Sequence, residues 1–202
     1  ETLKTTINTD QGMPYTPRHL VESRGRAASP EDRPNLDLMR YVVPEQTRCL
    51  VGSLDVQGGT TSRFIFQLHA VGPYMEQWLV DRHEIKLSMR EGMGEKFAPI
   101  DPAAYPEDWD VITEKLLRAT WRTPIEGREI KLKMLVVDTG GEDGVTANAY
   151  QWFRRVRQAG LADRVMLYKG ASAKGAPVLK QSLVGKRTAK SRADIPLFVC
   201  NP

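Results

Sequence analysis

The stretch CLVGSLDV, residues 49–56, is a short run of almost continuously apolar residues. The stretch KLKMLVVD, residues 131–138, has the same character farther along the chain. Runs of this length and composition are typical of central β-strands that are buried on both faces. Each run carries an aspartate at or near its end, Asp55 in the first and Asp138 in the second. The two stretches therefore predict the centre of a sheet with an acidic residue on each of two central strands.

The segments around these two runs predict the other elements of the fold. Turn signals at Gly58-Gly59 and Gly72-Pro73 separate three strands that form an antiparallel meander. A helix, a strand, a second helix and a further strand follow, and right-handed crossovers then put the fourth strand beside and parallel to the first. The predicted fold class is α/β, a ribonuclease H-like mixed sheet (an antiparallel three-strand meander plus parallel strands) flanked by helices. The expected strands are residues 49–56, 63–71, 76–85, 131–138, 164–168 and 195–199, and the expected helices are residues 107–121 and 145–159.

Composition divides the chain into two parts. Residues 16–47 are rich in proline and show little apolar periodicity, so we interpret residues 1–47 as a linker or N-terminal arm. Residues 48–202 are long enough to bury one core and form the predicted folded domain. The chain starts at Glu1 without an initiator methionine or a signal sequence, which indicates a piece of a longer protein.

Composition also limits the kinds of site that the chain can form. No apolar run of roughly eighteen residues occurs, so we expect no membrane-spanning segment. Cys49 and Cys200 form no disulfide framework, and His19, His69 and His83 show no zinc spacing. We therefore expect a reducing, cytosolic setting and no soft metal ion bound by cysteine or histidine.

Asp55 and Asp138 are the candidate functional residues. If their strands are parallel neighbours, the two carboxylates emerge at the same edge of the sheet, where open α/β sheets place their sites. Two close carboxylates repel each other unless a cation lies between them, and oxygen ligands suit Mg²⁺ or Mn²⁺. Two such ions, roughly 3.5–4 Å apart, could support phosphodiester hydrolysis. The alternative is a structural role, because an aspartate at a strand end is commonly a turn residue or a helix cap.

A basic segment begins at the end of the fifth predicted strand. Residues 169–193 contain no acidic residue, although the rest of the chain has a negative balance. Lysines and arginines without interleaved aromatic residues neutralise phosphates and do not read bases, so we expect sequence-independent, salt-sensitive nucleic-acid binding. We predict a mobile loop or hairpin over the edge that carries the carboxylates, and a solvated loop without a partner is the alternative. The basic residues of the segment are Lys169, Lys174, Lys180, Lys186, Arg187, Lys190 and Arg192. On the second helix, Arg154, Arg155 and Arg157 either extend this basic track or form a solvated face.

Five short motifs occur in the order of a known family. They are NTDQGMPY at residues 8–15, LDVQ at 54–57, WLVD at 78–81, DTGG at 138–141 and YKGAS at 168–172. In this series the chain resembles the large terminase subunit of tailed bacteriophages, specifically the lambda-type GpA family. The resemblance covers nearly the whole chain and lies in the C-terminal endonuclease domain of that protein.

The resemblance implies a DNA-packaging motor with an N-terminal ATPase and a C-terminal ribonuclease H-like endonuclease that cuts concatemeric DNA. Asp55 matches the family's first metal carboxylate, and Asp138 matches the acidic residue at the end of the fourth strand. Asp81 matches a recurrent aspartate of the third strand and is a lesser candidate metal ligand, for which an ion pair or a turn is the alternative. The implied cofactor is Mg²⁺ or Mn²⁺, with two ions in a complete site. The implied partners are double-stranded DNA, the small terminase subunit and the portal, in the cytoplasm of an infected bacterial cell.

This sequence departs from the family pattern near its end. The family has a further catalytic aspartate on a late helix, in a motif that resembles Glu-Ala-Leu-Asp, and no such motif precedes Pro202. We therefore expect residues 1–47 to follow a missing ATPase domain and residues 48–202 to lack the end of the nuclease domain. A lysine that is common shortly after YKGAS is Ala176 here. A DNA-binding or docking module without chemistry is the alternative for this chain.

A second alternative is a phosphotransferase of the sugar-kinase/actin/Hsp70 class, which shares this strand order. Residues 55–61, DVQGGTT, and 138–141, DTGG, resemble its two phosphate-binding loops, in which backbone N–H groups hold phosphates. That class needs two such domains around a cleft, and a chain of 202 residues with an N-terminal arm is too short for both.

Overall fold

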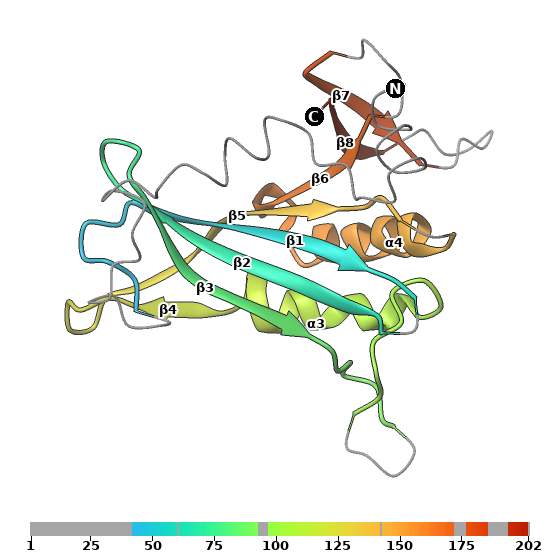
Figure 1. The fold of residues 1–202 in the computed structure, drawn as a ribbon, viewed down its shortest axis with the longest axis horizontal. Coiled ribbons are helices and arrows are strands. Elements are labelled where there is room, and N and C mark those ends of the chain that lie inside the picture. The colour runs from blue at the N-terminus through green and yellow to red at the C-terminus, as the bar shows by residue number, and fades with distance from the viewer. Residues whose placement is uncertain are drawn as a thin grey trace, which may run out of the picture. The chain divides into compact units, whose positions relative to one another are not determined.

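The sheet dominates the described part of the chain. The computed structural model describes residues 42–59, 61–92, 97–141, 143–171, 177–185 and 194–201. In these residues one sheet has the strand order β3-β2-β1-β5-β6-β8-β7, with β4 paired to β5 (Figure 1). The strands are β1 (Cys49–Gln57), β2 (Arg63–Val71), β3 (Gln77–Ile85), β4 (Thr120–Arg122), β5 (Glu129–Asp138), β6 (Val165–Gly170), β7 (Leu179–Val184) and β8 (Ile195–Cys200).

The strands have the mixed topology that the sequence predicts. β1, β2 and β3 form an antiparallel meander, whereas β1, β5, β6 and β8 follow one another as parallel neighbours. β7 pairs antiparallel with β8 at the edge opposite β3. Part of the basic segment, for which we predict a loop or hairpin, therefore forms a regular strand. The predicted fold class, a ribonuclease H-like mixed sheet flanked by helices, is confirmed.

The helical part differs from the prediction at one point. The predicted helix 107–121 ends early, because Thr120–Arg122 leaves it and pairs with the first residues of β5. Trp121 has helical spacing from Leu117, but the cross-strand partner Ile130 decides its place, and tertiary pairing of this kind overrides local propensity. The helical elements are the 3-10 turn η3 (Pro106–Trp109), α3 (Asp110–Ile112), the π-helical turn η4 (Thr113–Leu117), α4 (Val145–Gln158) and the 3-10 turn η5 (Ala162–Arg164). None of the described helices is long and apolar enough to cross a membrane.

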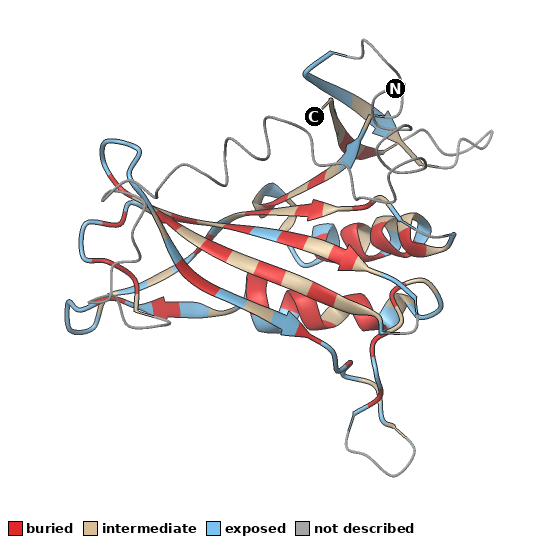
Figure 2. Cartoon of the chain, in the orientation of Figure 1, coloured by how far each residue is buried: buried red, intermediate tan, exposed pale blue. Residues whose placement is uncertain are grey.

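α3, α4 and their flanking turns cover one face of the sheet (Figure 1). Along β1 and β2 every second residue is buried, and Figure 2 shows this alternation of buried and less buried residues. Trp109 of η3 meets Phe64 of β2 edge-on, with ring centroids 5.2 Å apart, and lies 5.8 Å from the ring of Trp152 on α4. These rings are fully buried, so they anchor the helices to this face. We call the other face of the sheet, which carries residues 53, 55 and 57 of β1, the second face.

The chain joins the core before β1 begins. Val43 is fully buried, and its N–H group donates to the carbonyl of Arg122. Arg128 donates to the carbonyls of Glu45 and Thr47, at 2.8 and 2.9 Å. Residues 42–47 thus pack on β4 and β5, although the sequence analysis assigns them to the N-terminal arm. The rest of that arm lies outside the described residues.

Candidate active site

Asp55 and Asp138 lie side by side on the second face. Leu54 of β1 is in register with Val137 of β5, and both are buried on the helix side. Asp55 follows Leu54 on β1, and Asp138 follows Val137 on β5. Both carboxylates therefore point to the second face, where they are half-buried. Parallel neighbours are about 4.8 Å apart. The structure therefore brings together the two residues that the sequence singles out, while their catalytic role stays a prediction.

Short-range hydrogen bonds hold both carboxylates. The amide of Gln57 donates to Asp55 Oδ2 at 2.5 Å, and the N–H group of Gly140 donates to Asp138 Oδ1 at 2.8 Å. A Cβ atom at Gly140 would lie only 3.1 Å from that oxygen, so glycine allows the close approach. Thr139 is buried, and its N–H and hydroxyl groups both donate to the carbonyl of Tyr168 at 3.0 Å. The turn after Asp138 is consequently fixed to the neighbouring strand.

Tyr168 is a third polar residue at this place. It is directly opposite Asp138 in the pairing of β5 with β6, and it is half-buried like Asp138. Burial raises the pKa of the Tyr168 phenol, and the negative charges of Asp138 and Asp55 and a hydrogen bond with Asp138 raise it further. Tyr168 is part of the motif YKGAS and has no role predicted from the sequence. Its position at the end of a strand parallel to the Asp138 strand is the signal that could have identified it.

The described lysines of the basic segment lie on the β6–β7 side of the carboxylates. Lys169 is exposed, and its Cγ lies 3.9 Å from the place of a Cβ atom at Gly140. Lys180 is exposed on β7. Lys169 thus lies beside the turn after Asp138, but it alternates with buried Leu167, so its side chain is on the helix face, where it lines a pocket with Tyr150 of α4. The other basic residues of the segment, Lys174, Lys186, Arg187, Lys190 and Arg192, lie outside the described residues.

The structure does not bring Asp81 to the carboxylate pair. Asp81 is opposite Leu68, whose side chain is fully buried on the helix side, so Asp81 lies on the face away from Asp55. Its carboxylate is buried and lies 2.6 Å from Nδ1 of His83. This position fits the ion-pair alternative, and we leave Asp81 out of the site.

The arginines of α4 bind acidic residues of the domain. Arg154 and Arg157 contact the Asp194 carboxylate at 3.0 and 2.9 Å, and Arg155 contacts Asp110 at 2.9 Å. The hydrogen bond from Arg154 holds the pKa of Asp194 below its usual value, and Arg157 adds to this effect. All three arginine side chains are more than one third exposed, so the expected solvated face is present with ion pairs to Asp194 and Asp110, and the basic track stays a prediction.

The donor atoms of the pair fit a hard cation. Both side chains offer oxygen, which suits Mg²⁺ and Mn²⁺ better than softer metal ions. Two adjacent carboxylates on one face can share such an ion, which also relieves their mutual repulsion. Within the described residues, no group of three or more histidine, cysteine, aspartate or glutamate side chains is placed to hold a metal ion. The described part of the chain therefore supplies two carboxylates.

A mixed sheet of this order, with aspartates at the ends of two central parallel strands, defines a ribonuclease H-like domain whose candidate site lies at the carboxyl ends of those strands. A family model narrows this class. The model described as terminase large subunit gpA, endonuclease domain, matches residues 1–202. The chain belongs to this family, and the resemblance found in the sequence is confirmed. No curated protein and no solved structure matches the chain.

Proposed function

We propose that the chain is a Mg²⁺- or Mn²⁺-dependent endonuclease domain that cuts concatemeric DNA, with Asp55 and Asp138 as its metal-binding carboxylates. Membership in the terminase endonuclease family supports a nuclease role in DNA packaging. The placement of the two carboxylates on adjacent parallel strands and on one face carries the assignment of the residues. The family gives no support to the phosphotransferase alternative.

Each residue around the pair has a role in this proposal. Asp55 and Asp138 would hold the ion, and Gln57 and the Gly140 N–H group orient their oxygens. Tyr168 lies opposite Asp138 on β6, and exposed Lys169 at the end of the same strand can approach a phosphate at this edge. When bound, Mg²⁺ or Mn²⁺ supplies a Lewis acid for the phosphate and lowers the pKa of a water molecule. In a complete site two ions would share these tasks.

Double-stranded DNA is the proposed substrate, and the family supports packaging partners in general. We infer that the small terminase subunit and the portal bind the protein in the cytoplasm of the infected host. The most direct test of the function is nicking of supercoiled plasmid by the 202-residue chain. We expect nicking with Mn²⁺ and none after chelation of the metal ion. Nicking that is insensitive to chelation would contradict metal dependence.

A non-catalytic DNA-binding or docking module remains the second candidate. One observation favours it, namely the lack of a third acidic ligand in the described residues. The plasmid experiment separates the two, because a docking module binds DNA and leaves the plasmid supercoiled at every Mn²⁺ concentration.

We expect Tyr168→Phe to slow Mn²⁺-dependent nicking about tenfold to a hundredfold and to raise the Mn²⁺ concentration needed for half-maximal rate. The change removes one hydrogen bond to a charged group, which contributes roughly 1.5–3 kcal/mol. Tyr74→Phe is the control, because Tyr74 is an exposed phenol in the turn between β2 and β3, at the end of β1 opposite Asp55. An unchanged Mn²⁺ requirement in Tyr168→Phe would remove Tyr168 from the site.

We also expect neutralisation of Lys186, Arg187 and Lys190 to weaken binding to duplex DNA and to flatten its salt dependence. Each lost phosphate contact lowers the slope of log K against log salt concentration by about one. Binding curves at several salt concentrations measure this slope. An unchanged slope would show that these residues are solvated and do not contact DNA.

A further inference from the structure

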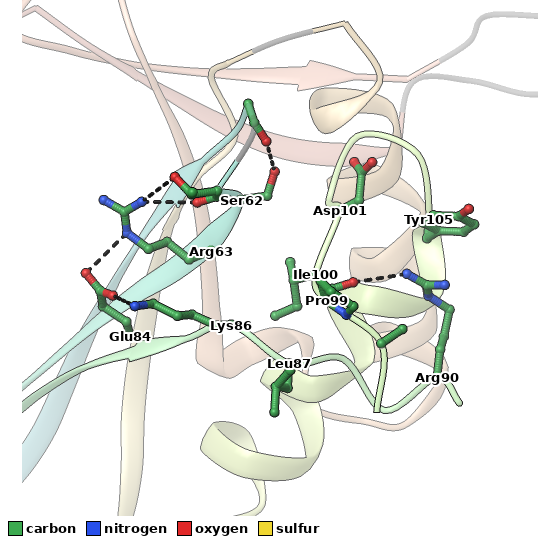
Figure 3. Close-up of a pocket in the computed structure, with 13 residues that line it drawn as sticks. Ser62, Arg63, Glu84, Lys86, Leu87, Arg90, Pro99, Ile100, Asp101 and Tyr105 are labelled. Carbon is green, nitrogen blue, oxygen red and sulfur yellow. Dashed lines mark hydrogen bonds and ion pairs between the residues drawn. The ribbon is translucent and has the colours of Figure 1, made fainter. Parts of the chain in front are cut away.

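A pocket of about 870 Å³ lies beyond the start of β2 and the end of β3 (Figure 3). There the chain leaves the sheet after β3 and returns towards α3. Its first wall carries Arg63, Glu84 and Lys86, and its second wall carries Arg90 and Tyr105. Asp55, Asp138 and the described residues of the basic segment do not line it. The pocket is therefore separate from the candidate active site.

The first wall has a positive balance. Glu84 lies between two cations, with Arg63 Nε 3.2 Å from one carboxylate oxygen and Lys86 Nζ 2.7 Å from the other. The hydrogen bond from Lys86 lowers the pKa of Glu84, and Arg63 contributes in the same direction, so Glu84 stays ionised. Both side chains of the Lys86–Glu84 pair are exposed, and such pairs contribute little to stability, whereas Arg63 is only 28% exposed and also donates to the carbonyl of Thr61. An incoming anion can therefore take the place of Glu84 beside Lys86.

The second wall is fixed by its own contacts. Arg90 pairs with buried Asp108 at 2.6 Å, and its guanidinium lies 3.6 Å from the centre of the Tyr105 ring. Asp101 accepts hydrogen bonds from the N–H groups of Ala103 and Ala104. Asp108 balances the charge of Arg90, and Asp101 adds a carboxylate to this wall. The available positive charge of the pocket is that of the first wall.

The first wall lies on the second face of the sheet, in line with the carboxylate pair. Asp55 is opposite Ile65, and Ile65 is opposite Glu84. At about 4.8 Å per strand, Glu84 is about 10 Å from Asp55 across the sheet. Arg63 and Lys86 are thus on the second face, on the β3 side of the carboxylates, whereas Lys169 and Lys180 follow the alternation of buried Leu167 and lie on the helix face.

We propose that this pocket binds a backbone phosphate of the DNA substrate, with Arg63 and Lys86 as its cationic partners. Arginine offers a planar fork of donors to phosphate oxygens, and lysine offers a point charge. The inference rests on the proposed nuclease function and extends it. In this arrangement the duplex is held on the second face, on the β3 side of Asp55 and Asp138.

The test combines Arg63→Gln with Lys86→Gln in the 202-residue chain and measures duplex DNA binding without divalent metal ions. We expect the salt slope to fall by about two and the affinity at moderate salt to fall about tenfold. Glu84→Gln removes the competing acid and is expected to tighten binding. The matched control is Lys131→Gln with Lys133→Gln, an equal charge change on exposed positions of β5 that lie roughly 16 Å or more from Asp138.

The proposal would be overturned by an unchanged slope in the double variant or by an equal loss in the control pair. It would also be overturned if the wild-type chain bound no duplex at low salt. If thermal unfolding shows that the double variant is not folded, the single variant Lys86→Gln tests the proposal, because Lys86 is 66% exposed. The expected change of the salt slope is then about one. Binding is measured without cleavage, so a failure of the nuclease proposal appears separately in the plasmid experiment.

Discussion

Asp138→Asn is expected to lower the rate of Mn²⁺-dependent plasmid nicking about a thousandfold, and Asp55→Asn to do the same. Asparagine keeps the size of the side chain and can still accept the hydrogen bond that the Gly140 N–H group donates to Asp138. It lacks the negative charge that holds a divalent cation. A metal ion in such a site contributes several kcal/mol to the transition state, and about 4 kcal/mol equals a thousandfold in rate.

The same variants are expected to keep the fold and to bind duplex DNA at least as tightly as the wild type, because each loses a negative charge near a phosphate. Asp163→Asn is the matched control, since Asp163 is exposed on η5, before the start of β6 and away from the carboxyl ends of the strands. Its nicking rate should equal that of the wild type. Nicking that persists in both Asp55→Asn and Asp138→Asn would show that the site lies elsewhere.

Asp108→Ala is expected to lower the free energy of unfolding by about 3 kcal/mol. Asp108 is fully buried and accepts hydrogen bonds from Ser88 Oγ, from Arg90 and from the N–H group of Asp101, the last at 2.6 Å. Removing one partner of a buried ion pair costs roughly 3–5 kcal/mol. The lower end applies because Arg90 is 26% exposed and can recover some hydration.

The control for this prediction is Asp110→Ala, two residues along the chain. Asp110 pairs with Arg155, but both side chains are more than one third exposed. Surface pairs of this kind contribute about 0–1 kcal/mol, so a much smaller loss is expected. Urea unfolding followed by circular dichroism measures both values. Equal losses in the two variants would mean that Asp108 does not join the 88–101 segment to the core.

The central part of the fold could be predicted from the sequence because its strands carry strong patterns. β1 and β5 are nearly continuous apolar runs, and right-handed crossovers make them parallel neighbours. Once these strands are adjacent, Asp55 and Asp138 must lie at one edge, which the structure confirms. Trp121 is wrongly predicted to be helical, because over a stretch as short as this strand the local sequence pattern fits both a helix and a strand.

The positions of Asp81 and Tyr168 needed the structure. The sequence places Trp78 and Val80 on one face of the third strand, so regular alternation would turn Asp81 to the other face. An irregularity in the pairing, between Leu68 and His69 of β2, lets Val80 and Asp81 both be buried. Tyr168 can be assigned to the site only because it pairs with Asp138 across the sheet. Nothing in the motif YKGAS distinguishes a site residue from a packing residue.

The most direct measurement is the anomalous diffraction of crystals of the chain grown with saturating Mn²⁺. We predict an anomalous peak within coordination distance of carboxylate oxygens from both Asp55 and Asp138, on the second face of the sheet. The peak should disappear in crystals of the Asp138→Asn variant. Mn²⁺ bound elsewhere in the domain, with no peak between Asp55 and Asp138, would contradict the proposed site.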